Sequence, residues 1–197
     1  MLRNRTVLPR VAAKIVAGLV RARRGDPEVW SALNEAKVIA AAAGELKYLA
    51  PVSAARAEAA WLEGRNDAVR DETEEAFRGA LDHRAGWLVG ELAAWRRRAG
   101  VQDEVPVVVA APYAAELAGD WDRAARLWTE LGCPYDAALA RIGADREEPL
   151  RESLGDLQRL GARAAVAIVA RRLRELGARD LLDAISTPRS GSVSVRR

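Results

Sequence analysis

The chain has 197 residues, half of them hydrophobic, a single cysteine and a formal net charge of +3. This composition excludes a disordered chain and an internal disulfide, and no apolar run approaches the roughly 20 residues that a transmembrane helix needs. Alanine, leucine, arginine and glutamate dominate and favour helix, whereas isoleucine, phenylalanine and tyrosine are scarce. We therefore expect an all-α protein that is cytoplasmic and not bound to a membrane.

Apolar residues recur at helical spacing over most of the chain, and glycines interrupt them. A first helix is predicted from Leu8 to Arg24, with Gly25 at its end and Asp26 as the cap of the second helix. A fourth helix is predicted after the sequence RND (65–67), with its asparagine or aspartate as the cap. The other predicted helices span residues 28–43, 45–63, 84–99, 109–118, 121–131, 134–142, 147–160 and 162–176.

The segment VQDEVPVVVAAP (101–112) breaks this pattern. The residues VPVVV would suit a strand, but the sequence offers no second strand to pair with them, so we expect a loop. Residues 186–197 are rich in serine, glycine and arginine and are expected to be a disordered tail. Residues 1–185 are therefore predicted to form a single helical-repeat domain of about ten helices.

Three of the expected turns resemble one another, because each places a glycine and an acidic residue between two helices. They are RRGDPEVW (23–30), LEGRNDAV (62–69) and LAGDWDRA (117–124). Short turns imply antiparallel hairpins, and repeated turns a few tens of residues apart are typical of stacked two-helix units. Such units bury their apolar faces only against neighbours. We predict TPR-like stacked helical hairpins that form an α-solenoid, a right-handed superhelix with a concave groove.

The sequence GDWDRAARLW (119–128) contains two aspartates and two tryptophans, which could indicate either an acidic reaction centre or a helix–helix turn. It resembles the turn and second helix of a tetratricopeptide repeat. Gly119 and Asp120 match the turn of that repeat, and Ala124 and Trp128 match its small and large residues on one helix face. Carboxylates in a first helical turn cap free amides, so the turn is the favoured interpretation.

Four longer segments follow one another between residues 10 and 179. They are RARRGDPEVWSALNEA, GELKYLAPVSAARAEAAWLEG, PYAAELAGDWDRAARLWTELGCPYDAALA and RLGARAAVAIVARRLRELGAR. Together they resemble the helical-repeat region of large bacterial ATP-binding regulators with a LuxR-type DNA-binding end. In that family an ATPase core precedes the repeats and a helix-turn-helix domain follows them.

The sequence departs from this family at both ends. It has no G-x-x-x-x-G-K-[ST] motif, and the residues after Arg179 are too few for a complete DNA-binding domain. The resemblance therefore implies only the role of the repeat region, which is to sense or hold a partner or ligand.

Few residues are candidates for chemistry. His83 is the only histidine, and with Cys133 it cannot supply the three or four ligands of a zinc site. His83 is expected at a helix end and Cys133 as a small buried residue. Adjacent carboxylates such as Glu74 and Glu75 point in different directions on a helix and do not converge on a substrate. We predict no catalytic, metal-binding or cofactor-binding residue, and we do not expect an enzyme.

The charges are distributed unevenly. Residues 1–24 hold seven basic and no acidic side chains, residues 163–197 hold eight and three, and the residues between hold 16 and 25. Basic ends around an acidic middle favour head-to-tail contact or a neighbouring domain. Direct nucleic-acid binding is not expected, because the basic ends carry no aromatic side chain for stacking. The basic runs at 95–100 and 170–179 are expected to be charges at helix C-termini.

Five residues are predicted to line the concave groove and contact a partner: Arg56, Trp61, Glu91, Trp95 and Tyr113. We expect a non-enzymatic module that binds a protein partner, or a second copy of itself, by accepting a helix in the groove. The alternative is a sensing module of a transcription regulator that binds a small-molecule effector in the same groove.

Overall fold

The computed structural model describes residues 7–186, and this part of the chain is all-helical, as expected. Its ten helices are α1 (Val7–Arg24), α2 (Val29–Ala43), α3 (Leu46–Leu62), α4 (Asn66–Asp82), α5 (Gly86–Arg98), α6 (Ala111–Ala118), α7 (Trp121–Glu130), α8 (Pro134–Gly143), α9 (Glu147–Arg159) and α10 (Arg163–Ser186). No strand occurs in this described part, and the segment between α5 and α6 is the loop that the sequence predicts. No described helix is both long enough and apolar enough to cross a bilayer.

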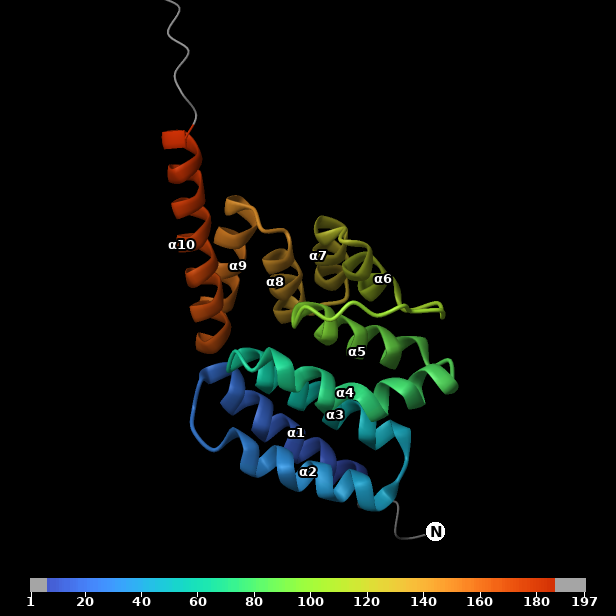
Figure 1. The fold of residues 1–197 in the computed structure, drawn as a ribbon. Coiled ribbons are helices and arrows are strands. Elements are labelled where there is room, and N and C mark those ends of the chain that lie inside the picture. Colours follow the sequence, from blue (N-terminus) through green and yellow to red (C-terminus); the bar gives the residue numbers. More distant parts are fainter. Residues whose placement is uncertain (1–6, 187–197) are drawn as a thin grey trace, which may run out of the picture.

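The helices stack in chain order. Each helix packs against the next one, and α3 also packs against both α1 and α5. In Figure 1, α1 to α5 lie across the view while α7 to α10 stand upright, so the array turns sharply after α5. The last helix returns to the first layer, where α10 contacts α1 and α3. Consecutive helices are thus in contact, and the TPR-like α-solenoid with its right-handed superhelix stays a prediction.

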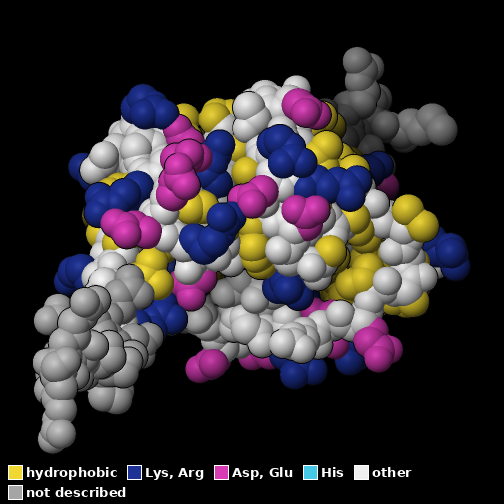
Figure 2. Space-filling model, turned by 90° about the horizontal axis from the view of Figure 1, so that it is seen from above, with side chains coloured by type: hydrophobic (Ala, Val, Ile, Leu, Met, Phe, Trp, Pro, Cys, Tyr) yellow, Lys and Arg dark blue, Asp and Glu magenta, His cyan; other side chains and the backbone are white. Residues whose placement is uncertain are grey.

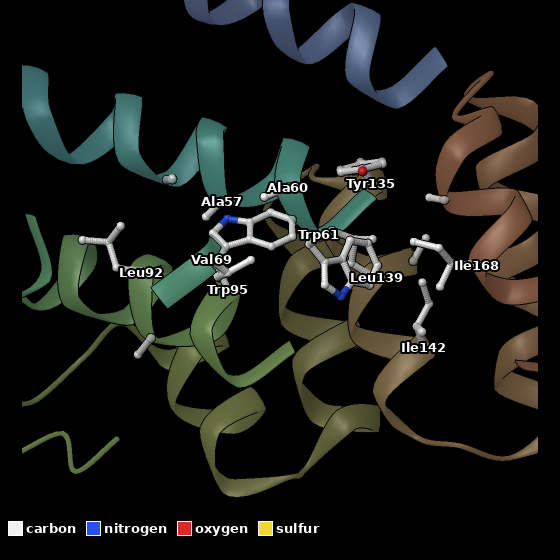
Figure 3. Packing of buried hydrophobic residues seen from close by; sticks show 14 of the residues in the cluster. Ala57, Ala60, Trp61, Val69, Leu92, Trp95, Tyr135, Leu139, Ile142 and Ile168 are labelled. Carbon is white, nitrogen blue, oxygen red and sulfur yellow. The ribbon is translucent and has the colours of Figure 1, made fainter. Parts of the chain in front are cut away.

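One large buried cluster joins the two halves of the array. Trp61 of α3 and Trp95 of α5 lie at its centre, with their ring centroids 5.9 Å apart. Leu139 and Ile142 of α8 and Ile168 of α10 belong to the same cluster and lie on the Trp61 side of the pair (Figure 3). Alanines fill most other core positions, which lets the helix backbones approach closely. The tryptophans therefore fill the space that small side chains leave open between α3, α5 and α8.

The turns confirm one predicted cap and contradict another. Asp120 caps α7, because its Oδ1 accepts a hydrogen bond from the backbone N–H of Arg123 at 3.2 Å. Asp26 does not cap α2, which starts later, after Glu28 in a left-handed conformation. The Asp26 carboxylate instead pairs with Arg163 of α10 at 2.8 Å. A long-range ion pair thus takes the side chain that local spacing assigns to the helix end.

The prediction for the fourth helix is also wrong in detail. Arg65 occupies the N-cap position of α4, and no side chain caps that helix with a hydrogen bond. Asn66 and Asp67 already belong to its first turn. Asp67 can still interact favourably with the positive end of the helix dipole there.

The last helix is longer than the sequence predicts. The sequence predicts a helix that ends at residue 176, but α10 continues from Arg163 through Gly177 to Ser186. Gly177 is exposed and does not adopt a positive φ, and helix-forming residues follow it, so the helix passes through this glycine. Disorder is predicted for residues 186–197, and of these only Ser186 lies within the described residues.

Candidate functional site

The five residues predicted to line a groove lie mostly in the interior. Arg56, Trp61, Trp95 and Tyr113 are 5–7% exposed, and Glu91 is half-buried. The structure brings Trp61 and Trp95 into contact and places Glu91 close enough to Tyr113 to affect its ionisation. The contacts of Arg56 are with Trp30, Asn34 and Glu72. Their contact with a partner stays a prediction, and in the folded chain these side chains serve the protein's own packing.

Arg56 connects three helices. Its guanidinium donates two hydrogen bonds of 2.6 Å to Glu72 of α4 and one of 2.7 Å to the side-chain oxygen of Asn34 of α2. It also lies 4.9 Å from the ring centroid of Trp30. Burial opposes the ionisation of Glu72, but the hydrogen bonds and charge of Arg56 hold its pKa below the usual value. Arg56 is therefore a structural crosslink between α2, α3 and α4.

The basic run at the end of α5 is not simply a set of exposed helix-end charges. Arg96 is only 2% exposed. It donates to Asp103 of the following loop at 2.7 and 2.8 Å and to Glu74 of α4 at 3.0 Å. It also donates a hydrogen bond of 3.2 Å to the hydroxyl of Thr73. Arg96 thus fixes the long loop against α4, and the sequence spacing gave no sign of these partners.

A second buried ion pair, between an arginine and a glutamate, joins α5, α6 and α7. Glu116 of α6 is 1% exposed and accepts a hydrogen bond of 2.5 Å from Arg98. Its other oxygen accepts the indole N–H of Trp128 at 2.7 Å. Trp128 also packs edge-to-face on Tyr113, with ring centroids 5.0 Å apart. The Trp128 that matches the repeat pattern is therefore held by a buried carboxylate as well as by apolar packing.

The acidic side chain of Glu91 lies in an unusual environment beside α3 and α8. The pKa of Glu91 is raised from 4.5 to about 7, mainly by burial and also by the charges of Asp136 and Glu58, while the charge of Arg98 opposes the shift. Glu58 is itself held by Arg23 of α1 at 2.6 and 3.0 Å. Glu91 can therefore change its charge near neutral pH.

A buried tyrosine borders the same region. The guanidinium carbon of Arg23 lies 3.9 Å from the ring centroid of Tyr135. The hydroxyl of Tyr135 is buried and has no hydrogen-bond partner among the described residues. Over the same part of the chain, no group of three or more histidine, cysteine or acidic side chains could hold a metal ion. The region is a polar interior with no metal-binding geometry in the described part.

A pocket of about 280 Å³ lies where α3, α5, α7, α8 and α10 meet. It is lined by Trp61, Arg97, Arg98, Gly100, Gln102, Trp121, Leu139, Ile142, Gly143 and Arg172. Gly100 ends α5 in a left-handed turn, and both Gly100 and Gln102 are exposed. The pocket therefore opens to solvent where the chain leaves α5.

The shape of the pocket depends on a close contact between α7 and α8. A Cβ atom added at Gly143 would lie 2.6 Å from the ring of Trp121, so this indole packs directly on the α8 backbone. Arg97 lies over the same indole, with 5.6 Å between its guanidinium carbon and the ring centroid. From α10, Arg172 donates to the backbone carbonyl of Ile142 at 3.0 Å. The pocket thus combines aromatic walls with positively charged side chains.

An exposed apolar stripe runs along α1. Leu8, Val16 and Val20 are 58%, 60% and 43% exposed, and the exposed Ala12 lies between the first two. These residues recur every four positions, so they share one face of the helix. On the face seen in Figure 2, by contrast, basic and acidic side chains are interspersed, with hydrophobic ones between them. We refer to Leu8, Ala12, Val16 and Val20 as the α1 stripe.

The remaining sequence candidates occupy helix ends. His83 lies at the C-terminus of α4, as predicted, and is exposed, with Nδ1 2.8 Å from the carbonyl oxygen of Gly79. Cys133 occupies the N-cap position of α8 and is half-buried rather than fully buried. Its thiol lies 3.8 Å from the carbonyl oxygen of Leu131, two residues earlier in the same turn.

Comparisons with known proteins assign no family to the chain. No family model matches it, and neither a curated protein nor a solved structure is significantly similar to it. Function must therefore be argued from the pocket, the buried polar groups and the α1 stripe.

Proposed function

We propose that the chain is a non-enzymatic helical-repeat module that binds an amphipathic helix of a protein partner along the α1 stripe. The observation that carries the proposal is the exposure of Leu8, Val16 and Val20 on one face of α1. Single exposed aliphatic residues are ordinary, but a continuous apolar stripe is typical of an interaction surface. Burying one such side chain stabilises a complex by roughly 1.5–3 kcal/mol.

The net charge of α1 selects the kind of helix that fits. Arg10 and Arg24 are exposed on α1, and the helix contains no acidic residue. A partner helix with acidic residues beside its apolar face would therefore complement α1. A second copy of α1 would instead bring basic side chains next to basic side chains, which disfavours self-association through this face.

Site-specific crosslinking tests this proposal. A photoreactive amino acid is placed at position 16 in the full chain expressed in its own host cell, and at the exposed position 151 of α9 as the control. We expect one discrete product from position 16, its loss in Val20→Glu, and an acidic amphipathic helix in the captured protein. A synthetic peptide of that helix should bind the purified chain and should bind Val20→Glu more weakly, because a charge then faces the apolar contact.

Two outcomes would overturn the proposal. One is the absence of a discrete product at position 16, or a product that Val20→Glu leaves unchanged. The other is a crosslink to a second copy of the chain, which would assign the stripe to self-association instead of a partner helix.

A second function, small-molecule sensing, is favoured by the pocket beside Trp61 and Trp121. A ligand there would contact five helices from both halves of the array and could shift how they pack. Partner binding and ligand sensing together would suit the repeat region of a LuxR-type ATP-binding regulator, which the sequence resembles. In support of that role, the pocket and the stripe lie on different parts of the chain and could be occupied together.

A further inference from the structure

We propose that the pocket between α3, α5, α7, α8 and α10 binds a compact organic anion, in which a flat apolar ring carries a carboxylate or phosphate group. This inference rests on the sensing function proposed above and names its ligand class. It does not depend on the α1 stripe, so the two proposals can fail separately.

The charge of the pocket selects an anion. Its lining contains three arginines and no acidic side chain. Arg98 is already neutralised by Glu116 at 2.5 Å. Arg97 and Arg172 have no carboxylate within ion-pair distance among the described residues. Two arginines without an ion-pair partner therefore line one small volume, and guanidinium is the side-chain group best matched to carboxylate and phosphate oxygens.

The two guanidinium groups are held in place before any ligand enters. Arg97 is restrained by the Trp121 ring and Arg172 by the carbonyl oxygen of Ile142. They approach the pocket from different helices, α5 and α10, so an anion between them would be held from two sides. A preorganised pair loses less side-chain freedom on binding than two free surface arginines.

The walls and the volume select the remainder of the ligand. Trp61, Trp121, Leu139 and Ile142 give the pocket flat and apolar surfaces. Its volume of about 280 Å³ is just below the usual range of about 300–1,000 Å³ for ligand sites, which suits one ring with a single charged group. The exposed Gly100 and Gln102 leave an entrance through which such a ligand can reach the arginines.

The test is a titration of the full chain, labelled with ¹⁵N, while the indole N–H signals of the six tryptophans are followed. The probes are benzoate, phenyl phosphate and the uncharged benzamide. We expect benzoate, phenyl phosphate or both to shift the signals of Trp61 and Trp121, while Trp30 stays unchanged and benzamide has no effect. A response to only one anion identifies the carboxylate or the phosphate as the preferred group.

Substitutions separate a specific site from general attraction of anions. Arg97→Gln and Arg172→Gln should each weaken binding by about tenfold to 100-fold, because each removes a charge-assisted hydrogen bond. Arg10→Gln, on exposed α1, is the matched control and should bind as the original chain does. Val20→Glu should also leave these shifts unchanged, which keeps this result independent of the stripe.

The inference is overturned if benzamide binds as well as benzoate, since the charge would then be irrelevant. It is also overturned if none of the probes shifts Trp61 or Trp121 at millimolar concentration. Equal weakening by Arg10→Gln and Arg97→Gln would likewise reject the pocket as the site. Because either arginine variant could unfold, the salt dependence of benzoate binding to the original chain is measured too, and binding that salt does not weaken counts against the inference.

Discussion

The charge of Glu91 makes the stability of this protein depend on pH in a direction that can be measured. Burial, together with the charges of Asp136 and Glu58 and against that of Arg98, raises the pKa of Glu91 from 4.5 to about 7. A raised folded-state pKa means that folding favours the protonated carboxyl. Below about pH 4.5 the carboxyl is protonated in both the folded and the unfolded state and does not lower the free energy of unfolding. Above about pH 7 it is ionised in both states, and the full loss of stability is present.

The free energy of unfolding should therefore fall as the pH rises between these two values. The shift of about 2.5 pKa units corresponds to at most about 3 kcal/mol at 1.36 kcal/mol per unit. The full value is an upper limit, because the Glu91 side chain keeps some exposed surface. Glu91→Gln removes the ionisable group but keeps its size and shape.

Urea denaturation at a series of pH values checks this reasoning. We expect the original chain to be less stable at about pH 8 than at about pH 5 and Glu91→Gln to lose most of that difference. At about pH 8 the variant should be the more stable protein, by up to about 3 kcal/mol. Glu75→Gln, which removes an exposed carboxylate of α4, is the control and should retain the original pH dependence. Equal pH dependence in Glu91→Gln and the original chain would refute the argument.

Further predictions concern packing and the buried ion pair. Gly143→Ala should destabilise the fold by about 1–3 kcal/mol, because its Cβ would lie 2.6 Å from the Trp121 ring. Gly177→Ala, in an exposed helical position with open space around it, should instead be neutral or stabilise the fold by up to about 1 kcal/mol. A lower melting temperature for Gly177→Ala than for Gly143→Ala would contradict the close contact between Gly143 and Trp121. Glu116→Gln should lower the free energy of unfolding, measured by urea denaturation, by about 3–5 kcal/mol. The side chain of Arg98 is only 12% exposed, and the substitution would leave its charge without a counter-charge. A cost below about 1 kcal/mol would mean that the pair behaves like an exposed one.

The sequence predicts the helices of this protein better than their contacts. Helical periodicity and glycine-containing turns indicate nine of the ten helices to within a few residues of the bounds seen in the described part. These signals are local, because each depends on residues within one or two turns. The predicted end of the last helix is wrong for the same reason. A glycine near the end of a periodic segment indicates a helix terminus, but the residues around Gly177 continue the helix.

The buried polar groups could not be predicted in this way. Arg96 lies in a basic run that resembles any charged helix end, yet its partners Glu74 and Asp103 come from another helix and from the loop. The sequence predicts Glu91 as a groove residue, but it gives no sign that Asp136 of α8 and Glu58 of α3 lie close enough to raise its pKa. A charged residue in a helix gives no periodic signal of its distant partner, so such pairs become visible only when the tertiary arrangement is known.

The return of α10 to the start of the array has a consequence for how the chain folds. Arg163 at the beginning of α10 meets Asp26 in the turn between α1 and α2, across a separation of 137 residues. In an open repeat array, a terminal unit can melt while the remainder stays ordered, because each unit depends only on its neighbour. Here the two ends support each other, so loss of either one exposes the other to water. We therefore expect the closure of this loop of 137 residues to slow folding, and α1 and α10 to unfold together.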